Sequence, residues 1–197
     1  MEFCEVIRRQ HMTRRFVQRP VPPKLLRQIL TAGQKAPSAG FTQGSVMAVL
    51  EGGNRDLFWR LADPRGRKPA ESRAPVVILP LASKEAYLRR YGERDKMATG
   101  LSREDEWPAP YWTVDCAFAA MTIMLAATAA GLGCWFFGIF TGTEELLRQL
   151  ALPQEYEPIG AICIGYPAAE DVRSPSLRRG RKPLDEFAIR PTTKSEG

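Results

Sequence analysis

Apolar residues recur at helical spacing in the first part of the chain. Phe3 and Val6 fall on one side of a short helix predicted over residues 2–9. A second helix is predicted from Pro23 to about Gly33, because proline is favoured in a first turn and leucine or isoleucine then recurs three and four residues apart. The sequence Pro-Ser-Ala-Gly that follows ends this helix in a loop.

Short uninterrupted apolar runs predict buried strands, since a strand covered on both faces needs no alternation with polar residues. Such runs, rich in valine, isoleucine or aromatic residues, occupy residues 46–50, 75–81, 134–139 and 158–164. Surface helices are predicted between them, at residues 55–61, 83–91 and 143–150.

The longest apolar stretch predicts a central helix over residues 110–130. Thr113 is a candidate N-cap with Asp115 in the first turn, and apolar residues then surround the whole helix. The uncharged run 116–140 has the length of a bilayer span. We reject that interpretation, because the run is rich in alanine, is broken by a Gly-Leu-Gly sequence and continues into a strand.

The order of these elements predicts one α+β domain over residues 1–197, with a central mixed sheet flanked by helices and a long buried central helix. No glycine-rich loop follows a strand, which argues against a dinucleotide-binding fold. The polar, interrupted segment 92–110 is predicted to be a mobile flap, and residues 168–197 a basic C-terminal extension.

Composition is ordinary for a globular protein, with 44% hydrophobic and 25% charged residues. The net charge of +6 permits nucleic-acid binding. Arginines concentrate at residues 8–19 and 173–190, however, without the interleaved aromatic residues that single-strand binders use, so we expect no nucleic-acid partner.

Four widely spaced cysteines, three of them in apolar stretches, predict buried free thiols rather than disulfides or a zinc site. The first residues show no cationic leader followed by an apolar core. We therefore expect a cytoplasmic protein with no membrane partner.

Few residues suit catalysis without a cofactor. His11 is the only histidine and no Gly-x-Ser-x-Gly sequence accompanies it, which argues against a hydrolase. The acidic run 104–106 lies in a polar stretch and is interpreted as solvated charge, so no metal site is expected. Such a chain leaves its chemistry to a cofactor.

Several short motifs in fixed order resemble the landmarks of one family across nearly the whole chain. They are Arg14-Arg15-Phe16, Pro20-Val21-Pro22, residues 36–40 with Gln43, Ala126-Ala127, residues 131–135, residues 150–153, residues 164–168 and residues 179–186. In order and spacing they are similar to those of the nitroreductase family of flavoproteins. The resemblance implies a homodimer with one FMN in each of two sites at the subunit interface, partly closed by exchanged terminal segments.

The resemblance also implies the cofactor-binding positions of this chain, with no catalytic side chain because the flavin N5 carries the chemistry. These positions are Gln10, His11, Met12, Arg14, Pro37, Ser38, Ala39, Gly138, Ile139, Phe140, Thr141, Arg179 and Arg181. Guanidinium groups suit the dianionic phosphate of FMN because they donate bidentately. Surface charge is the alternative for each arginine, and a helix-ending turn is the alternative for the Pro-Ser-Ala loop.

The chain departs from the family pattern at four places. Members often carry an arginine and a serine where this chain has Gln10 and Met12, so the backbone, His11 or other arginines must contribute to phosphate binding. The loop position commonly held by asparagine is Phe41, and Gly44-Ser45 replaces a Pro-Trp pair. Contacts at the flavin edge are therefore expected to differ.

Aromatic residues are the candidates for the substrate pocket, since a planar acceptor binds by stacking. They are Phe41, Trp107, Tyr111 and Trp112, with core packing at the start of the central helix as the alternative for the last three.

The resemblance implies ping-pong catalysis, in which NADH or NADPH reduces FMN and leaves before an acceptor such as a nitroaromatic, quinone or enone takes its place. Two alternatives stay open. One is a flavin-consuming synthase resembling dimethylbenzimidazole synthase, and the other is a flavin or deazaflavin carrier without turnover.

Overall fold

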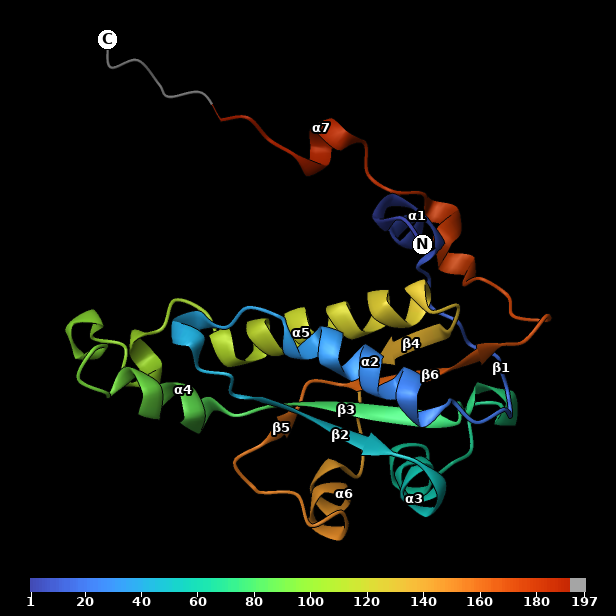
Figure 1. Cartoon of the computed structure of the whole chain (residues 1–197), viewed down its shortest axis with the longest axis horizontal. Coiled ribbons are helices and arrows are strands. Elements are labelled where there is room, and N and C mark those ends of the chain that lie inside the picture. Colours follow the sequence, from blue (N-terminus) through green and yellow to red (C-terminus); the bar gives the residue numbers. More distant parts are fainter. Residues whose placement is uncertain (192–197) are drawn as a thin grey trace.

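A central sheet with helices on both faces forms the body of the protein, as the computed structural model shows for residues 1–191 (Figure 1). The α-helices are α1 (Phe3–Arg9), α2 (Pro23–Gln34), α3 (Gly52–Ala62), α4 (Lys84–Tyr91), α5 (Tyr111–Ala129), α6 (Thr143–Gln149) and α7 (Leu184–Phe187). The strands are β1 (Phe16–Val17), β2 (Ser45–Leu50), β3 (Val76–Ala82), β4 (Gly133–Phe137), β5 (Glu157–Pro158) and β6 (Ala161–Pro167). The α+β architecture and its main elements are thus confirmed.

The sheet is antiparallel rather than mixed, which corrects the expectation. Its path is β1-β6-β3-β2, with β4 paired to β6 and β5 to β3, and every pairing between the described strands is antiparallel. The one parallel contact in residues 1–191 is an isolated bridge between Met12 and Cys134. Strand direction was not readable from periodicity, because burial on both faces also occurs in an antiparallel sheet that helices cover on both sides.

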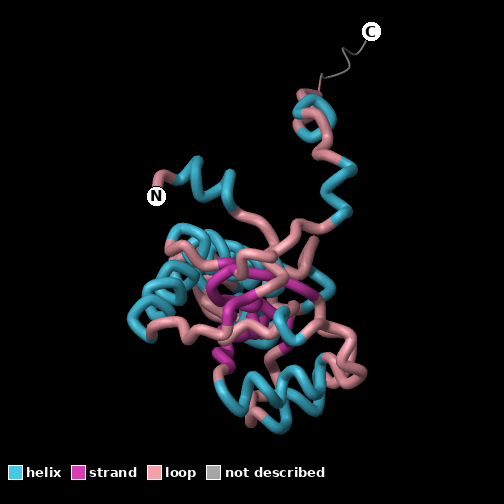
Figure 2. The backbone as a smooth tube through the Cα atoms, turned by 90° about the vertical axis from the view of Figure 1, so that its right-hand side faces the viewer, coloured by secondary structure: helices cyan, strands magenta, loops and turns pink. Residues whose placement is uncertain are grey.

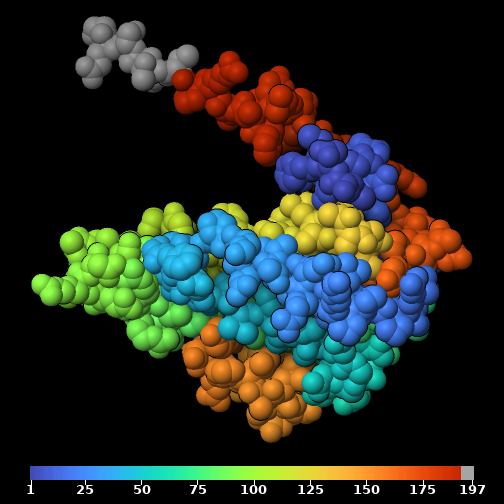
Figure 3. Space-filling view, viewed as in Figure 1, coloured from blue at the N-terminus to red at the C-terminus, as the bar shows by residue number. Residues whose placement is uncertain are grey.

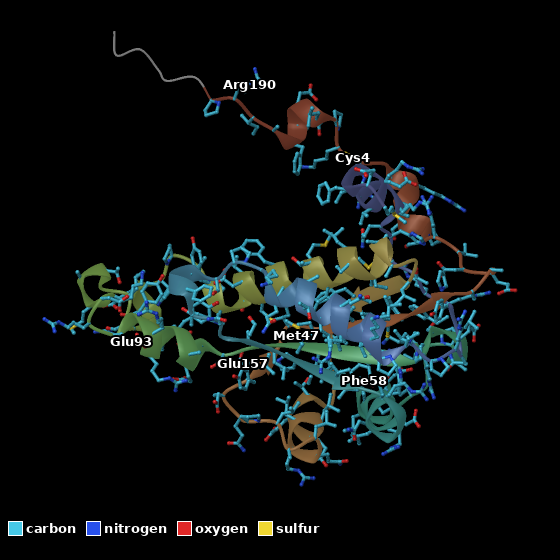
Figure 4. All side chains as sticks on the ribbon, viewed as in Figure 1. Cys4, Met47, Phe58, Glu93, Glu157 and Arg190 are labelled. Atoms are coloured by element: carbon cyan, nitrogen blue, oxygen red, sulfur yellow. The ribbon has the colours of Figure 1, made fainter. Side chains whose placement is uncertain are left out.

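Alternate residues of β3 supply two separate cores. Val76 and Ile78 face α2 and α5, where Ile29 and Ile123 complete the first core. Val77, Leu79 and Leu81 face the second core with Phe58, which projects from α3 toward the sheet (Figure 4). All seven residues of β3 are buried, so this strand holds the two helical layers together (Figure 2).

The central helix α5 lies within the predicted range 110–130, but its N-cap is Pro110, so the assignment of Thr113 to that position is wrong. Proline suits a helix start because it has no backbone N–H to leave unsatisfied. Asp115 lies beyond the first turn and is 5% exposed. Its carboxylate is a buried hydrogen-bond acceptor, as described below, and is not a first-turn charge that stabilises the helix dipole.

One face of α5 packs on α2 and the sheet, and the other face is apolar but uncovered. Phe118 and Met121 are 48% and 38% exposed, and Leu125 is half-buried on the same face. Within residues 1–191, α5 is the one helix whose length and hydropathy suit a membrane span. Its packed face, with Ala120 and Ile123 in the first core, identifies it as a core helix.

The two segments predicted to lie outside the core have different structures. Residues 92–110 contain two 3₁₀ turns, Met97–Thr99 and Glu104–Glu106, and their mobility stays a prediction. The C-terminal extension leaves the body after Asp171 and includes a 3₁₀ turn, Pro175–Arg179, before α7 (Figure 3). Residues 192–197 of the predicted extension lie outside the described residues.

Candidate functional site

The N-terminal segment 10–16 runs along the outer edge of β4. Thr13 N donates to Cys134 O at 2.9 Å, and Phe136 N donates to Met12 Sδ at 3.3 Å. Thr13 is fully buried against Gly133, where an added Cβ would lie 2.5 Å from Thr13 Oγ1. Because side chains alternate along an extended segment, the burial of Thr13 directs its neighbour Arg14 to the other side.

Asp171 fixes the backbone of the same segment from the far end of the chain. Its Oδ1 accepts hydrogen bonds from Arg14 N at 2.8 Å and Arg15 N at 2.9 Å. His11 lies beside it, with Nε2 3.6 Å from Asp171 Oδ2 and Nδ1 2.8 Å from Arg9 O. The start of the C-terminal extension therefore sets the position of the predicted arginine motif.

Two cations and two aromatic rings gather beside β4. The Arg14 Cζ and Lys68 Nζ atoms each lie 6.0 Å from the ring centroid of Trp135, and Lys68 Nζ is 4.8 Å from that of Phe137. Arg14 also donates to Met12 O at 3.0 Å. Neither cation forms an ion pair with a carboxylate of residues 1–191. Both charges are therefore available to an anionic or carbonyl-bearing ligand.

Sequence reasoning missed Lys68, because it lies in an irregular loop far from the arginine motif. Asp63 holds that loop, accepting from Arg67 N at 3.0 Å and Lys68 N at 2.9 Å. Burial opposes ionisation of Asp63, but these two N–H donors, together with the charges of Lys68 and Arg73, hold the pKa of its carboxyl below the usual value. The sequence offered one signal for Lys68: it lies in a loop that follows an aspartate, Asp63, and precedes a buried strand.

The predicted segment Gly138–Thr141 directly follows β4 and begins beside this cluster. Thr141 Oγ1 lies 3.4 Å from Leu61 O, which ties the segment to the end of α3. Phe140 is 92% exposed, and its ring lies 2.9 Å from where a Cβ on Gly138 would be. The Phe140 ring therefore occupies the space that a side chain at position 138 would need, so a glycine fits here.

The predicted Pro37-Ser38-Ala39 loop lies at the opposite edge of the sheet, between α2 and β2. Ser38 Oγ accepts from Gln43 N at 3.0 Å, and Ala39 N donates to Asp115 Oδ2 at 2.7 Å. The strands β6 and β3 separate β4 from β2, a distance of roughly 14 Å at ordinary strand spacing. A single chain therefore does not bring this loop to Arg14 and Gly138.

A cavity of about 650 Å³ opens beside the loop, between α2 and β2. Pro37, Ser38 and Asp115 line one part of it and Met47 another. A smaller cavity of about 250 Å³ lies near the other edge and is lined by His11, Thr13 and Arg173 among others. Arg179 and Arg181 lie on the exposed extension and contribute to neither cavity.

The four candidate pocket aromatics divide into an exposed residue and a packed group. Phe41 is 76% exposed with φ = 53°, a conformation that is strained for a residue with a Cβ. Trp107 packs against Tyr111 and Trp112 at ring-centroid distances of 5.6 and 6.2 Å, and its Nε1 donates to Leu101 O at 2.8 Å. Tyr111 remains 37% exposed and presents part of this group to solvent.

The residues along β4 fit a flavin nucleotide by their donor chemistry. Arg14 and Lys68 can donate to carbonyl or phosphate oxygens, and the Gln10 Nε2 donor is buried without a hydrogen-bond partner. Met12, in contrast, uses its sulfur as an acceptor for Phe136 N, so it supplies no phosphate donor from its side chain.

Three of the four cysteines are buried free thiols, as predicted, whereas Cys4 is exposed and corrects that expectation. Burial raises the pKa of the Cys116 and Cys134 thiols to about 11 and that of Cys163 to about 12, so all three stay protonated at neutral pH. Cys4 is exposed on α1. Among residues 1–191, no group of three or more histidine, cysteine or acidic residues is arranged to hold a metal ion.

Comparison with known proteins gives one family and a common fold. A family model described as the nitroreductase family matches residues 55–166. A Methanothermobacter thermautotrophicus protein, whose name offers NADH dehydrogenase or NAD(P)H nitroreductase as its candidate activity, is 26% identical over 171 residues, covering 85% of this chain and 78% of that protein. The NAD(P)H FMN reductase of Bacillus subtilis is 28% identical over 169 residues, covering 83% and 65%.

A solved structure from Desulfovibrio desulfuricans, determined in complex with FMN, superposes with a TM-score of 0.72. It is 24% identical and the match covers 98% of each chain, so it establishes the common fold.

Proposed function

Because the chain belongs to the nitroreductase family, we propose that it is a cytoplasmic, homodimeric FMN oxidoreductase that passes electrons from NADH or NADPH to a small organic acceptor. The observation that carries this proposal is the pair of cations, Arg14 and Lys68, which lie beside Trp135 of β4 and form no ion pair with a carboxylate of residues 1–191. Cations near the flavin ring favour its reduced, more negative form. The relatives named for NAD(P)H and FMN support the same chemistry.

The separation of the predicted cofactor residues supports a dimer. Arg14 and Gly138 belong to the β4 edge of the sheet, whereas Pro37–Ala39 belong to the β2 edge. In the proposal, each site combines the β4 edge of one protomer with the Pro37–Ala39 loop of its partner. A closed twofold assembly of this kind gives two equivalent sites.

The uncovered apolar surfaces support the same assembly. Phe118 and Met121 on α5 leave an exposed apolar stripe, and larger exposed apolar areas of this kind mark interfaces. The C-terminal extension adds Leu184, Phe187 and Ile189, each at least 77% exposed, on a segment that projects from the body (Figure 3). We propose that these segments exchange between protomers and bring Arg179 and Arg181 to the FMN phosphate.

The proposed roles of the chain's own residues follow from their chemistry. Arg14 and Lys68 bind the polar atoms of the cofactor, and the backbone of Gly138–Thr141 approaches the ring. Gln10 and His11 donate at the phosphate end together with the two arginines of the extension. Phe41, Trp107, Tyr111 and Trp112 are proposed to line the acceptor pocket.

Bound FMN supplies the redox chemistry, accepting a hydride from the nicotinamide and passing two electrons to the acceptor. The protein positions both substrates by stacking and excludes water from the ring. No side chain is assigned as a general acid or base.

The visible spectrum of the purified protein tests the proposal, recorded before and after anaerobic addition of NADPH or NADH, with the released chromophore identified by mass. We expect an FMN spectrum that bleaches with a nicotinamide donor and returns with an added quinone. Fragmentation of the flavin would instead support the synthase alternative, and tight binding without bleaching the carrier. A protein that cannot be reconstituted with FMN would overturn the cofactor assignment.

A further inference from the structure

A buried carboxylate anchors the Pro37–Ala39 loop to the body of the protein. Asp115 Oδ2 accepts two hydrogen bonds, from Ala39 N at 2.7 Å and from the Tyr87 hydroxyl at 2.6 Å. Asp115 is 5% exposed and Tyr87 is fully buried. The loop peptide, the first third of α5 and the middle of α4 therefore meet at one oxygen atom.

Helix α4 contacts the next loop residue as well. Arg90 Nε donates to Gly40 O at 3.1 Å, and the Tyr91 ring lies 2.9 Å from where a Cβ on Gly40 would be. Tyr87, Arg90 and Tyr91 fall three and four residues apart, so they share one face of the helix. This face binds the Gly40 carbonyl directly and reaches the Ala39 N–H through the Tyr87 hydroxyl and Asp115.

The aromatic group around Trp107 supports these tyrosines. Its ring centroid lies 6.0 Å from that of Tyr87 and 4.6 Å from that of Tyr91, both edge to face. Residues 92–110 therefore back the face of α4 that carries the loop. Such edge-to-face packing restricts the tyrosines to one orientation.

Asp115 has no cation as a partner in the described part of the chain. A buried carboxylate without a counter-ion is costly, and neutral donors offset only part of that cost. An apolar residue would pack at this position of α5 at lower cost. A functional need for the loop conformation that Asp115 imposes would explain why a carboxylate is present at this position.

We propose that Asp115 and Tyr87 are positioning residues, which fix the Ala39 peptide so that Pro37, Ser38 and Ala39 face the flavin bound by the partner protomer. The inference rests on the proposed function, because the flavin is what the loop is positioned for. In this proposal both residues act through the loop, since Asp115 Oδ2 accepts from Ala39 N and from the Tyr87 hydroxyl. Their loss leaves the β4 part of the site intact and loosens only the loop.

The test uses Tyr87→Phe and Asp115→Asn in the full-length protein, with Tyr156→Phe as the matched control, since the Tyr156 hydroxyl forms no hydrogen bond within residues 1–191. Hydrogen exchange of the peptide that contains Ala39 is measured in the apoprotein. The dissociation constant of FMN is measured by fluorescence quenching, well below the unfolding temperature of each variant.

We expect faster exchange at Ala39 and a roughly three- to tenfold weaker affinity for FMN in both variants, the size of one lost hydrogen bond. The visible spectrum at saturating FMN should also shift, which a general loss of stability would not cause. Tyr156→Phe should match the wild type. If Asp115→Asn does not fold, Tyr87→Phe alone decides the matter, because it keeps the aromatic ring and removes only the hydroxyl that fixes Asp115 Oδ2, which weakens the Ala39 hydrogen bond.

Faster exchange or a lower melting temperature with wild-type FMN affinity and spectrum would overturn the positioning role and leave the proposed function standing. Failure of the wild-type protein itself to bind FMN would overturn the proposed function.

Discussion

Arg14 and Lys68 converge on one ring, with Arg14 Cζ and Lys68 Nζ each 6.0 Å from the centroid of Trp135. Each is placed by a different aspartate, since Asp171 holds the backbone of Arg14 and Asp63 holds that of Lys68. Two segments that are far apart in sequence therefore place two positive charges at the same edge of the sheet. Removing either charge should weaken the binding of an electron-rich ligand without affecting the core.

Lys68→Met is expected to raise the dissociation constant of FMN about tenfold or more, because hydrogen bonds to charged groups contribute about 1.5–3 kcal/mol. Lys68→Arg keeps the charge and should retain most of the affinity. The measurement is a fluorescence titration at low and high salt, with Arg60→Met, a charge loss at an exposed position of α3, as the control. Equal affinity in Lys68→Met and Arg60→Met would remove Lys68 from the site.

Gly133→Ala should destabilise the protein by about 1–3 kcal/mol, because the new methyl group would lie 2.5 Å from Thr13 Oγ1 in a filled space. The displaced segment carries Arg14, so FMN affinity should fall as well. Gly53→Ala is the control, since nothing lies within 4 Å of its added Cβ. Urea unfolding of the apoprotein measures the stability of both variants. Equal stability of the two would show that the Thr13 segment can move aside without an energetic cost.

The Asp63 carboxyl should give a pH-dependent contribution to stability. Its folded-state pKa lies below the unfolded value of about 3.9, so the contribution is complete above about pH 4 and is lost as pH falls through the folded pKa. Asp63→Asn should therefore cost about 1–3 kcal/mol at pH 7 and clearly less at pH 3. Urea unfolding of both proteins at the two pH values measures the cost of the substitution. An equal cost at pH 7 and pH 3 would contradict the claim that the ionised Asp63 carboxylate provides this stability.

Periodicity predicted most elements because burial imposes it directly. The spacing of Leu26 and Ile29 places both in the core, and the apolar run of β3 is buried along its whole length. The N-cap of α5 was wrongly assigned because Thr113 has the chemistry of a cap, whereas Pro110 holds that position. Local preference alone does not show that Asp115 is needed as an acceptor for a loop 76 residues away.

The site itself was only partly predictable. The motif at Arg14 and the loop at Ser38 were found by resemblance, but their places at opposite edges of the sheet depend on strand order, which periodicity does not encode. Lys68 carried no local pattern, and its role arises from a contact with β4. Long-range pairing therefore decides which of the predicted residues can meet.

The claim that each flavin site joins the β4 edge of one protomer to the loop of its partner is tested most directly with mixed dimers. Arg14→Ala and Asp115→Asn, each carrying a different affinity tag, are co-expressed, and the doubly tagged dimer is isolated and titrated with FMN. The account predicts one wild-type site per mixed dimer, because both defects fall in the other site, while each parent homodimer has two weakened sites. Two weakened sites in the mixed dimer, one with the affinity of each parent homodimer, would contradict the shared-site arrangement.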